Sequence, residues 1–150
     1  GGWAVARALE STGHRWCVVP EQAEPDGEFP TTQFPNPEEP GALDYAIKIA
    51  ESVSADAIVA NDPDADRLAI AIQDCEGQWT RLTGDQVGLI FAYYLGTIQS
   101  LHPDTLLANT IVSSSQLKHM ADDFGIQYAC TLTGFKWLAN VGLKHRERLF

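Results

Sequence analysis

Short apolar runs of strand character alternate along the chain with stretches in which apolar residues recur at helical spacing. Two of these runs, residues 57–60 and 68–72, are bounded by polar residues and predict buried strands. Further strands are predicted at residues 15–19, 79–82, 106–112 and 126–131. Helices are predicted at residues 4–10, 43–53 and 87–95, between residues 117 and 125, and from residue 133 onward. This alternation predicts an α/β fold with mixed or parallel sheets.

The pattern stops between residues 20 and 40. This segment is dense in Pro, Glu, Asp and Gly and shows no hydrophobic periodicity. A long stretch without regular structure inside a compact domain is usually functional or disordered. We therefore expect a surface loop here.

An acidic loop separates the strands predicted at residues 57–60 and 68–72. It places Asp62, Asp64 and Asp66 at alternate positions, and their like charges repel one another. A hard divalent cation such as Mg²⁺, Mn²⁺ or Ca²⁺ would neutralise them, because such ions prefer oxygen ligands. Pro63 fixes one backbone angle and so lowers the entropy lost when the carboxylates are brought together.

Three interpretations of the acidic loop compete. A solvated acidic turn is possible, since Asp and Pro favour turns. A calcium-binding EF-hand is excluded, because its required Gly and Glu are replaced by Arg67 and Gln73 and the flanking elements are strands. The third is a catalytic metal site in which Arg67 binds an anion beside the metal. A cation and a guanidinium on one loop suit phosphoryl transfer, whose charge develops on phosphate oxygens.

A second candidate site follows the last predicted strand. Thr133 and Gly134 form a turn that opens a helix, where backbone N–H groups and the helix dipole favour an anion. Lys136 lies within the first turn of that helix. A second interpretation assigns these residues no function: Thr133 would cap the helix, and Lys136 would be a solvated surface lysine. The serines at 113–115 are interpreted as a helix N-cap cluster, because the chain lacks a Gly-x-Ser-x-Gly elbow.

Three motifs resemble those of one enzyme family. Asp-Pro-Asp-Ala-Asp-Arg at residues 62–67 resembles the metal-binding loop of the α-D-phosphohexomutases, the phosphoglucomutases and phosphomannomutases. Phe-Pro-Asn-Pro-Glu-Glu-Pro at residues 34–40 and Thr-Leu-Thr-Gly-Phe-Lys-Trp at residues 131–137 fit the same family in order and spacing. The last motif is most similar to the branch that contains phosphoglucomutase-2 and the phosphopentomutases. The resemblance covers essentially the whole chain.

The resemblance implies two consecutive α/β units, each a mixed sheet flanked by helices, with a cleft between them. Residues 1–82 would be the second domain of the enzyme, with the metal-binding loop. Residues 83–150 would be its third domain, incomplete at the C-terminal end. No Thr-Ala-Ser-His-Asn-Pro nucleophile loop, sugar-binding Gly-Glu-x-Ser-Gly loop or Arg-x-Ser-Gly-Thr phosphate clamp occurs in the chain. We therefore expect the remaining domains of the same enzyme as partners, and no turnover by these residues alone.

The activity that the resemblance implies is the transfer of a phosphoryl group between the C1 and C6 (or C5) hydroxyls of a sugar phosphate. An enzyme phosphoserine donates the group, and a sugar 1,6-bisphosphate serves as intermediate and activator. One Mg²⁺ would occupy each active site. The site residues would be Asp62, Asp64 and Asp66 for the metal, Arg67 for the phosphate, and Thr133, Gly134 and Lys136 for the substrate. Lys136 is also a candidate for proton transfer.

The composition of the chain limits the classes of molecule that it is expected to bind. The chain has 150 residues, 45% of them hydrophobic, and a formal net charge of −10. Nucleic acids and anionic membranes require a basic face, so neither is expected to bind, and no apolar run is long enough to cross a membrane. Three dispersed cysteines indicate a reducing compartment, the cytoplasm, and each is predicted to be buried. The expected ligand is a small sugar phosphate.

Two alternatives from other classes remain. A haloacid-dehalogenase-like phosphatase also places Asp-x-Asp after a strand, but it requires Thr or Val where Arg67 stands. A non-catalytic α/β module with a merely solvated acidic loop is the other. Trapping of an aspartyl phosphate on Asp62 would favour the first, and calorimetry with Mg²⁺ would separate the second from both enzymes.

Overall fold

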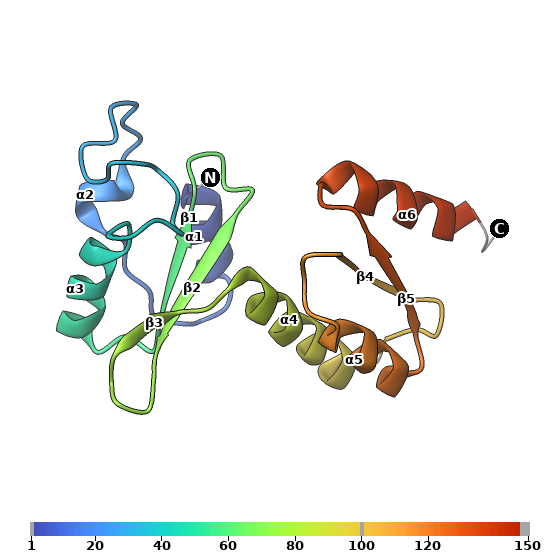
Figure 1. Cartoon of the computed structure of the whole chain (residues 1–150). Helices are drawn as coiled ribbons and strands as arrows, with labels where there is room; N and C mark the ends of the chain where they lie inside the picture. Colours follow the sequence, from blue (N-terminus) through green and yellow to red (C-terminus); the bar gives the residue numbers. More distant parts are fainter. Residues whose placement is uncertain (1, 100, 148–150) are drawn as a thin grey trace. The chain divides into compact units, whose positions relative to one another are not determined.

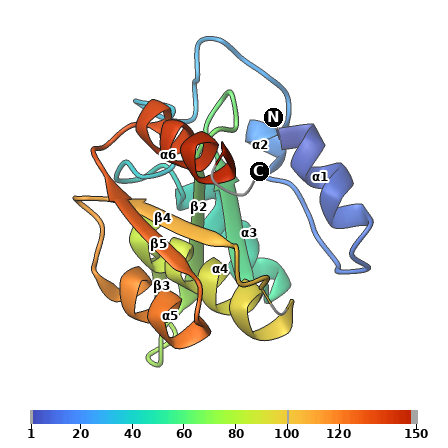
Figure 2. The same ribbon diagram turned by 90° about the vertical axis from the view of Figure 1, so that its right-hand side faces the viewer.

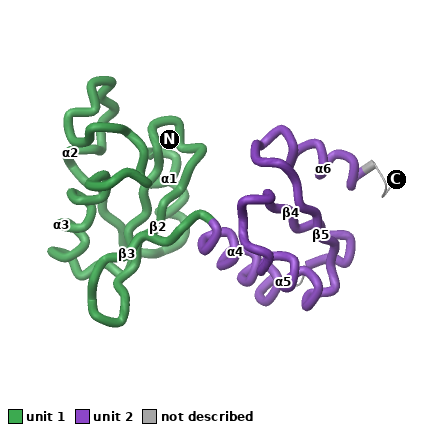
Figure 3. The backbone as a smooth tube through the Cα atoms, viewed as in Figure 1, with its two compact units in different colours: residues 1–84 green, residues 85–150 purple. Residues whose placement is uncertain are grey.

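The computed structural model describes residues 2–99 and 101–147 and confirms the α/β class. The chain forms two compact units, Gly1–Gly84 and Asp85–Phe150 (Figure 3). Each unit contains one small sheet. The strands are antiparallel in the first unit and parallel in the second. The two orientations therefore occur in different sheets rather than together within each sheet.

The first unit is built on an antiparallel sheet of strands β1 (Ala57–Asn61), β2 (Leu68–Gln73) and β3 (Trp79–Arg81), in that order (Figure 1). Helix α3 (Asp44–Val53) packs on one face of this sheet. Its Ala50 is buried against Ile58 and Ala71, which are cross-strand partners. Small alanines at this contact allow the helix to approach the sheet closely, and the hairpin that carries the acidic loop is thereby fixed.

The N-terminal part of the first unit contains helices α1 (Gly2–Glu10) and α2 (Pro20–Ala23). The strand predicted at residues 15–19 is wrong, because the backbone there is irregular. A strand exists only where another strand accepts and donates its hydrogen bonds, and the first sheet contains only β1, β2 and β3 among the described residues. The β-prone composition of this segment is therefore not sufficient.

The second unit begins with helix α4 (Gly84–Ile98), most of which it contains. Strands β4 (Leu106–Thr110) and β5 (Gln127–Thr131) then pair in parallel, connected by helix α5 (Gln116–Phe124) and followed by helix α6 (Phe135–Glu147). Both α5 and α6 contact both strands, and they lie on opposite sides of them (Figures 1 and 2). This arrangement places the starts of α5 and α6 after the carboxyl ends of neighbouring parallel strands.

The end of α5 agrees with the prediction, whereas the start of α5 and the burial of the cysteines differ from it. Gly125 adopts the left-handed conformation that ends α5, with φ of 67°, and the helix predicted between residues 117 and 125 ends there. Ser115 occupies the N-cap position of α5, but its side chain makes no capping hydrogen bond. All three cysteines are exposed, so their predicted burial is wrong. None of the described helices is long and apolar enough to span a membrane.

Candidate active site

The acidic loop joins β1 to β2 (Figure 1). Hydrogen bonds at two levels close it. The side-chain amide of Asn61 donates to the carbonyl of Arg67, at 3.0 Å. Inside this bridge, the N–H of Ala65 donates to the carbonyl of Asp62, also at 3.0 Å, which forms a tight turn. No role is predicted for Asn61 from the sequence, although Asn at the end of a strand and before a turn is a common signal of such bonding.

Ala65 has φ of 60°, a left-handed conformation that costs an L-residue with a Cβ about 1–2 kcal/mol. The loop retains this conformation between Asp64 and Asp66. The consequence is a compact turn in which one oxygen from each of Asp62, Asp64 and Asp66 lies within 4.8 Å of the others. The predicted clustering of the three carboxylates is therefore present in the structure.

Asp62 is the buried member of this group, with 5% of its surface exposed. Its Oδ1 accepts the backbone N–H of Arg67 at 3.1 Å, and its Oδ2 accepts the Arg67 Nε–H at 2.7 Å. Burial alone would raise the pKa of Asp62, but the hydrogen bonds from Arg67 outweigh it and lower the pKa to about 2. Asp62 is therefore an anion at neutral pH, which a metal ligand must be.

Asp64 and Asp66 are exposed. The charge of Asp64 raises the pKa of Asp66, and burial and the charge of Asp62 act in the same direction. Arg67 Nε lies 3.8 Å from Oδ1 of Asp66 and relieves part of this repulsion. Half of the Arg67 side chain is exposed, so its guanidinium also remains accessible from solvent.

The donor set of the acidic loop fits a hard divalent cation. All three donors are carboxylates, the ligands that Mg²⁺ and Mn²⁺ prefer. Neighbouring oxygens on an octahedral Mg²⁺ are about 2.9 Å apart, because its bonds are about 2.0–2.1 Å long. The three carboxylates, whose oxygens lie within 4.8 Å of one another, must therefore draw together to bind the ion, and the exposed side chains of Asp64 and Asp66 have room to move.

Thr133, Gly134 and Lys136 form the second predicted group, at the connection from β5 to α6. Gly134 has φ of 129°, which L side chains rarely adopt, and its carbonyl accepts the N–H of Trp137 at 3.0 Å. Thr133 and Lys136 are exposed. The Lys136 ammonium lies 5.7 Å from the centroid of the Trp137 ring and forms no ion pair with any residue in the described ranges. An anion that meets this turn would find an unneutralised cation.

The two groups belong to different units. Asp62, Asp64, Asp66 and Arg67 come together in the first unit, and residues 133–136 come together in the second. Their approach across a cleft stays a prediction.

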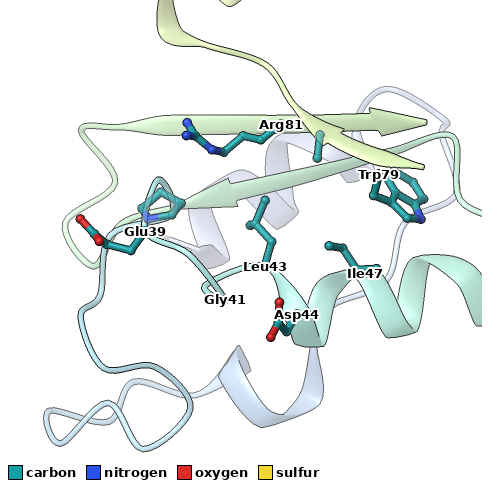
Figure 4. A pocket seen from close by; sticks show the side chains of 9 residues that line it. Glu39, Gly41, Leu43, Asp44, Ile47, Trp79 and Arg81 are labelled. Atoms are coloured by element: carbon teal, nitrogen blue, oxygen red, sulfur yellow. The ribbon is translucent and has the colours of Figure 1, made fainter. Parts of the chain in front are cut away.

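The motif at residues 34–40 is attached to the sheet of the first unit. Glu38 pairs with Arg81 of β3, with Oε1 and Nη1 separated by 3.5 Å. Pro37 and Glu39 line a pocket of about 140 Å³ between this segment, α3 and the sheet (Figure 4). None of the predicted metal or substrate residues lines this pocket, so we assign it no part in the site.

Models of two protein domains match the chain. Residues 1–77 match the phosphoglucomutase/phosphomannomutase alpha/beta/alpha domain II, and residues 83–148 match domain III of the same family. The chain belongs to the phosphoglucomutase/phosphomannomutase family. The family resemblance inferred from the three motifs is confirmed, and the haloacid-dehalogenase alternative is excluded.

Known members of the family are similar over most of this chain. A phosphoribomutase of Saccharomyces cerevisiae is 47% identical over 137 residues, which cover 85% of this chain and 22% of that protein. A probable phosphomannomutase of Haemophilus influenzae is 49% identical over 124 residues, or 83% of this chain and 25% of that protein. A phosphopentomutase of Mus musculus is 41% identical over 131 residues, or 82% and 21%. The chain therefore spans about a quarter or less of the length of these relatives.

Proposed function

We propose that this chain supplies the metal-binding loop and part of the substrate site of a phosphosugar mutase. The observation that supports this proposal most directly is that three carboxylates and Arg67 lie together on one loop of a phosphoglucomutase/phosphomannomutase domain II. The reaction is the transfer of a phosphoryl group between the C1 and C6 (or C5) hydroxyls of a sugar phosphate. The names of the relatives support this reaction, since each of those named here is a phosphomutase.

In the proposed site, Asp62, Asp64 and Asp66 hold one Mg²⁺ through carboxylate oxygens. When bound, the ion neutralises charge that develops on phosphoryl oxygens during transfer. Arg67 contacts the same phosphoryl group, because its guanidinium is already at the loop and half exposed. A planar, permanently charged group with several N–H donors suits phosphate oxygens.

Thr133, Gly134 and Lys136 bind the sugar phosphate. The turn contributes backbone N–H groups at the start of α6, where the helix dipole favours an anion. Lys136 contributes a charge without a competing ion pair among the described residues. It is also our candidate to move a proton to or from the reacting sugar hydroxyl.

The remaining parts of the mechanism come from outside these residues. We propose that a phosphoserine in another domain of the same enzyme donates the phosphoryl group, and that a sugar 1,6-bisphosphate is the intermediate and activator. The domain limits are proposed at residues 1–82 and 83–150, and the compartment is proposed to be the cytoplasm. These 150 residues alone are expected to bind metal weakly and to give no turnover.

The test is a turnover assay on the complete enzyme that carries these residues. Glucose 1-phosphate, mannose 1-phosphate and ribose 1-phosphate are each incubated with Mg²⁺ and a trace of the matching bisphosphate, and the products are followed by ³¹P NMR. We expect conversion of at least one of them to its 6- or 5-phosphate, loss of conversion in EDTA, and recovery with Mg²⁺. Release of inorganic phosphate without isomerisation would indicate a phosphatase and overturn the proposal.

A further inference from the structure

Ser114 is held at both of its backbone polar groups by side chains from other elements. Its N–H donates to Oδ1 of Asp85, in the first turn of α4, at 2.9 Å. Its carbonyl accepts the Nδ2 of Asn109, on β4, at 3.0 Å. The other end of the same amide, Oδ1 of Asn109, accepts the hydroxyl of Tyr128 on β5 at 2.8 Å. All four residues are partly buried.

The direction of each bond in this series is fixed by chemistry. A backbone carbonyl can only accept, so the amide group of Asn109 must point its nitrogen towards Ser114. Its oxygen is then directed at Tyr128, whose hydroxyl donates. The Asp85 carboxylate forms no ion pair with the residues at 2–99 and 101–147, so the Ser114 N–H supplies a partner for its charge.

The loop that contains Ser114 and the Thr133–Gly134 turn follow neighbouring strands of the same sheet. The loop consists of residues 111–115 and follows β4, whereas the turn follows β5, and the two strands are parallel neighbours. Thr110 pairs with Thr131, and the N–H of Ile111 donates to the carbonyl of Thr131 at 2.8 Å. Both connections thus leave the same carboxyl edge of the sheet, where ligands bind in parallel α/β sheets.

We propose that Asp85 and Asn109 are positioning residues for substrate binding: by fixing Ser114, they set the 111–115 loop as the second wall of the surface that Thr133 and Gly134 offer to the sugar phosphate. This inference rests on the proposed function. Within the loop, the Ser114 hydroxyl accepts the N–H of Gln116 at 3.4 Å, whereas Ser115 at the helix start forms no side-chain capping bond. In the sequence, Ser114 is interpreted only as part of a helix N-cap cluster. A bond between residues 29 positions apart leaves no periodic signal in the sequence.

Kinetics of three variants of the complete enzyme test the proposal. Asp85→Ala removes the acceptor for the Ser114 N–H, and we expect the KM for the sugar phosphate to rise about tenfold, as loss of one charge-assisted hydrogen bond allows. Asp85→Asn keeps an acceptor oxygen at the same place, and its KM should stay within about threefold of wild type, since a neutral hydrogen bond remains. Asp123→Asn is the matched control, because Asp123 is exposed on α5 and its KM should not change.

A further variant, at Asn109, covers the case in which Asp85→Ala does not fold. Asn109→Asp has the same shape, still accepts from Tyr128, and turns an oxygen towards the Ser114 carbonyl in place of the donor. It should also raise KM, with kcat changed less than KM. Amide NMR spectra provide a readout that is independent of activity. Asp85→Ala and Asn109→Asp should each shift the resonances of residues 111–115 and of Thr133 and Gly134, and Asp123→Asn should not.

The outcomes separate this inference from the proposed function. An active wild type whose KM is unchanged in folded Asp85→Ala and Asn109→Asp would overturn the inference alone. Shifts confined to residues 111–115, without any at Thr133 and Gly134, would also overturn it. A wild-type enzyme that turns over no sugar phosphate would overturn the proposed function, and the role of the loop in substrate binding with it.

Discussion

Nε of Arg67 lies 2.7 Å from Oδ2 of Asp62, and the backbone nitrogen of Arg67 lies 3.1 Å from the other oxygen of the same carboxylate. One residue therefore engages both oxygens of the most buried acid in the loop. The backbone bond holds the carboxylate in orientation, whereas the side-chain bond can be exchanged, because half of the Arg67 side chain is exposed. The guanidinium has further N–H donors besides the Nε–H that bonds Asp62, and these can reach an anion beside the loop.

Asp64→Asn should weaken Mg²⁺ and Mn²⁺ binding by about tenfold or more, because it removes a full charge from an all-carboxylate donor set. Stability should change little, since Asp64 is exposed. Titration calorimetry with Mn²⁺ on the 150-residue chain measures the effect. Asp56→Asn is the control: Asp56 is exposed in the same unit and lies outside the acidic group. Equal Mn²⁺ affinity of wild type and Asp64→Asn would show that the acidic loop is only a solvated turn.

Arg67→Lys should lower the activity of the complete enzyme, although it keeps the positive charge. Lysine lacks the planar set of N–H donors that can bond Asp62 and a phosphoryl oxygen at once. We expect kcat to fall at least about tenfold, the equivalent of one lost charge-assisted hydrogen bond. The measurement is the single-turnover rate of phosphoryl transfer, with Arg67→Ala beside it. If Arg67→Lys transfers the phosphoryl group at the wild-type rate, Arg67 has only a structural role.

The sequence predicted those elements whose partners are close in the chain. The β1–β2 hairpin and its acidic loop follow from two apolar runs separated by a few polar residues, and both are present. The segment at residues 15–19 has equally strand-like composition and forms no strand, because pairing depends on a backbone elsewhere. The Asp85–Ser114 bond could not be predicted for the same reason, because its two residues are far apart in the sequence. Helix spacing likewise predicted α4 but not the position where the Phe124 ring of α5 lies against it.

That position is Gly96. A Cβ added there would lie 2.2 Å from Cε2 of Phe124 on α5, closer than real atoms approach. Gly96→Ala should therefore destabilise the chain by about 1–3 kcal/mol through overpacking, despite the better helix propensity of alanine. Chemical denaturation measures the change. A stability equal to or above wild type would show that α4 and α5 do not meet at this point.

Two comparisons isolate the contact with Phe124. Gly88→Ala lies on the same helix with nothing within 4 Å of the new Cβ, so it should stabilise by about 0.5–1 kcal/mol. In a Phe124→Ala background the ring is gone, and Gly96→Ala should change sign and become stabilising by a similar amount. The double-mutant cycle therefore predicts a large coupling between two residues that no sequence pattern joins.

Lys136→Met should lower the turnover of the complete enzyme by about a hundredfold or more, because it removes the proposed proton-transfer group and a charge near the substrate. The melting temperature should stay nearly constant. Lys136 is exposed, and among the described residues its side chain makes one cation–π contact, with the Trp137 ring, which is worth about 0.5–1 kcal/mol. Lys144→Met, also exposed on α6, is the matched control and should retain activity. If both variants turn over equally well, the charge at residue 136 does not act in the reaction.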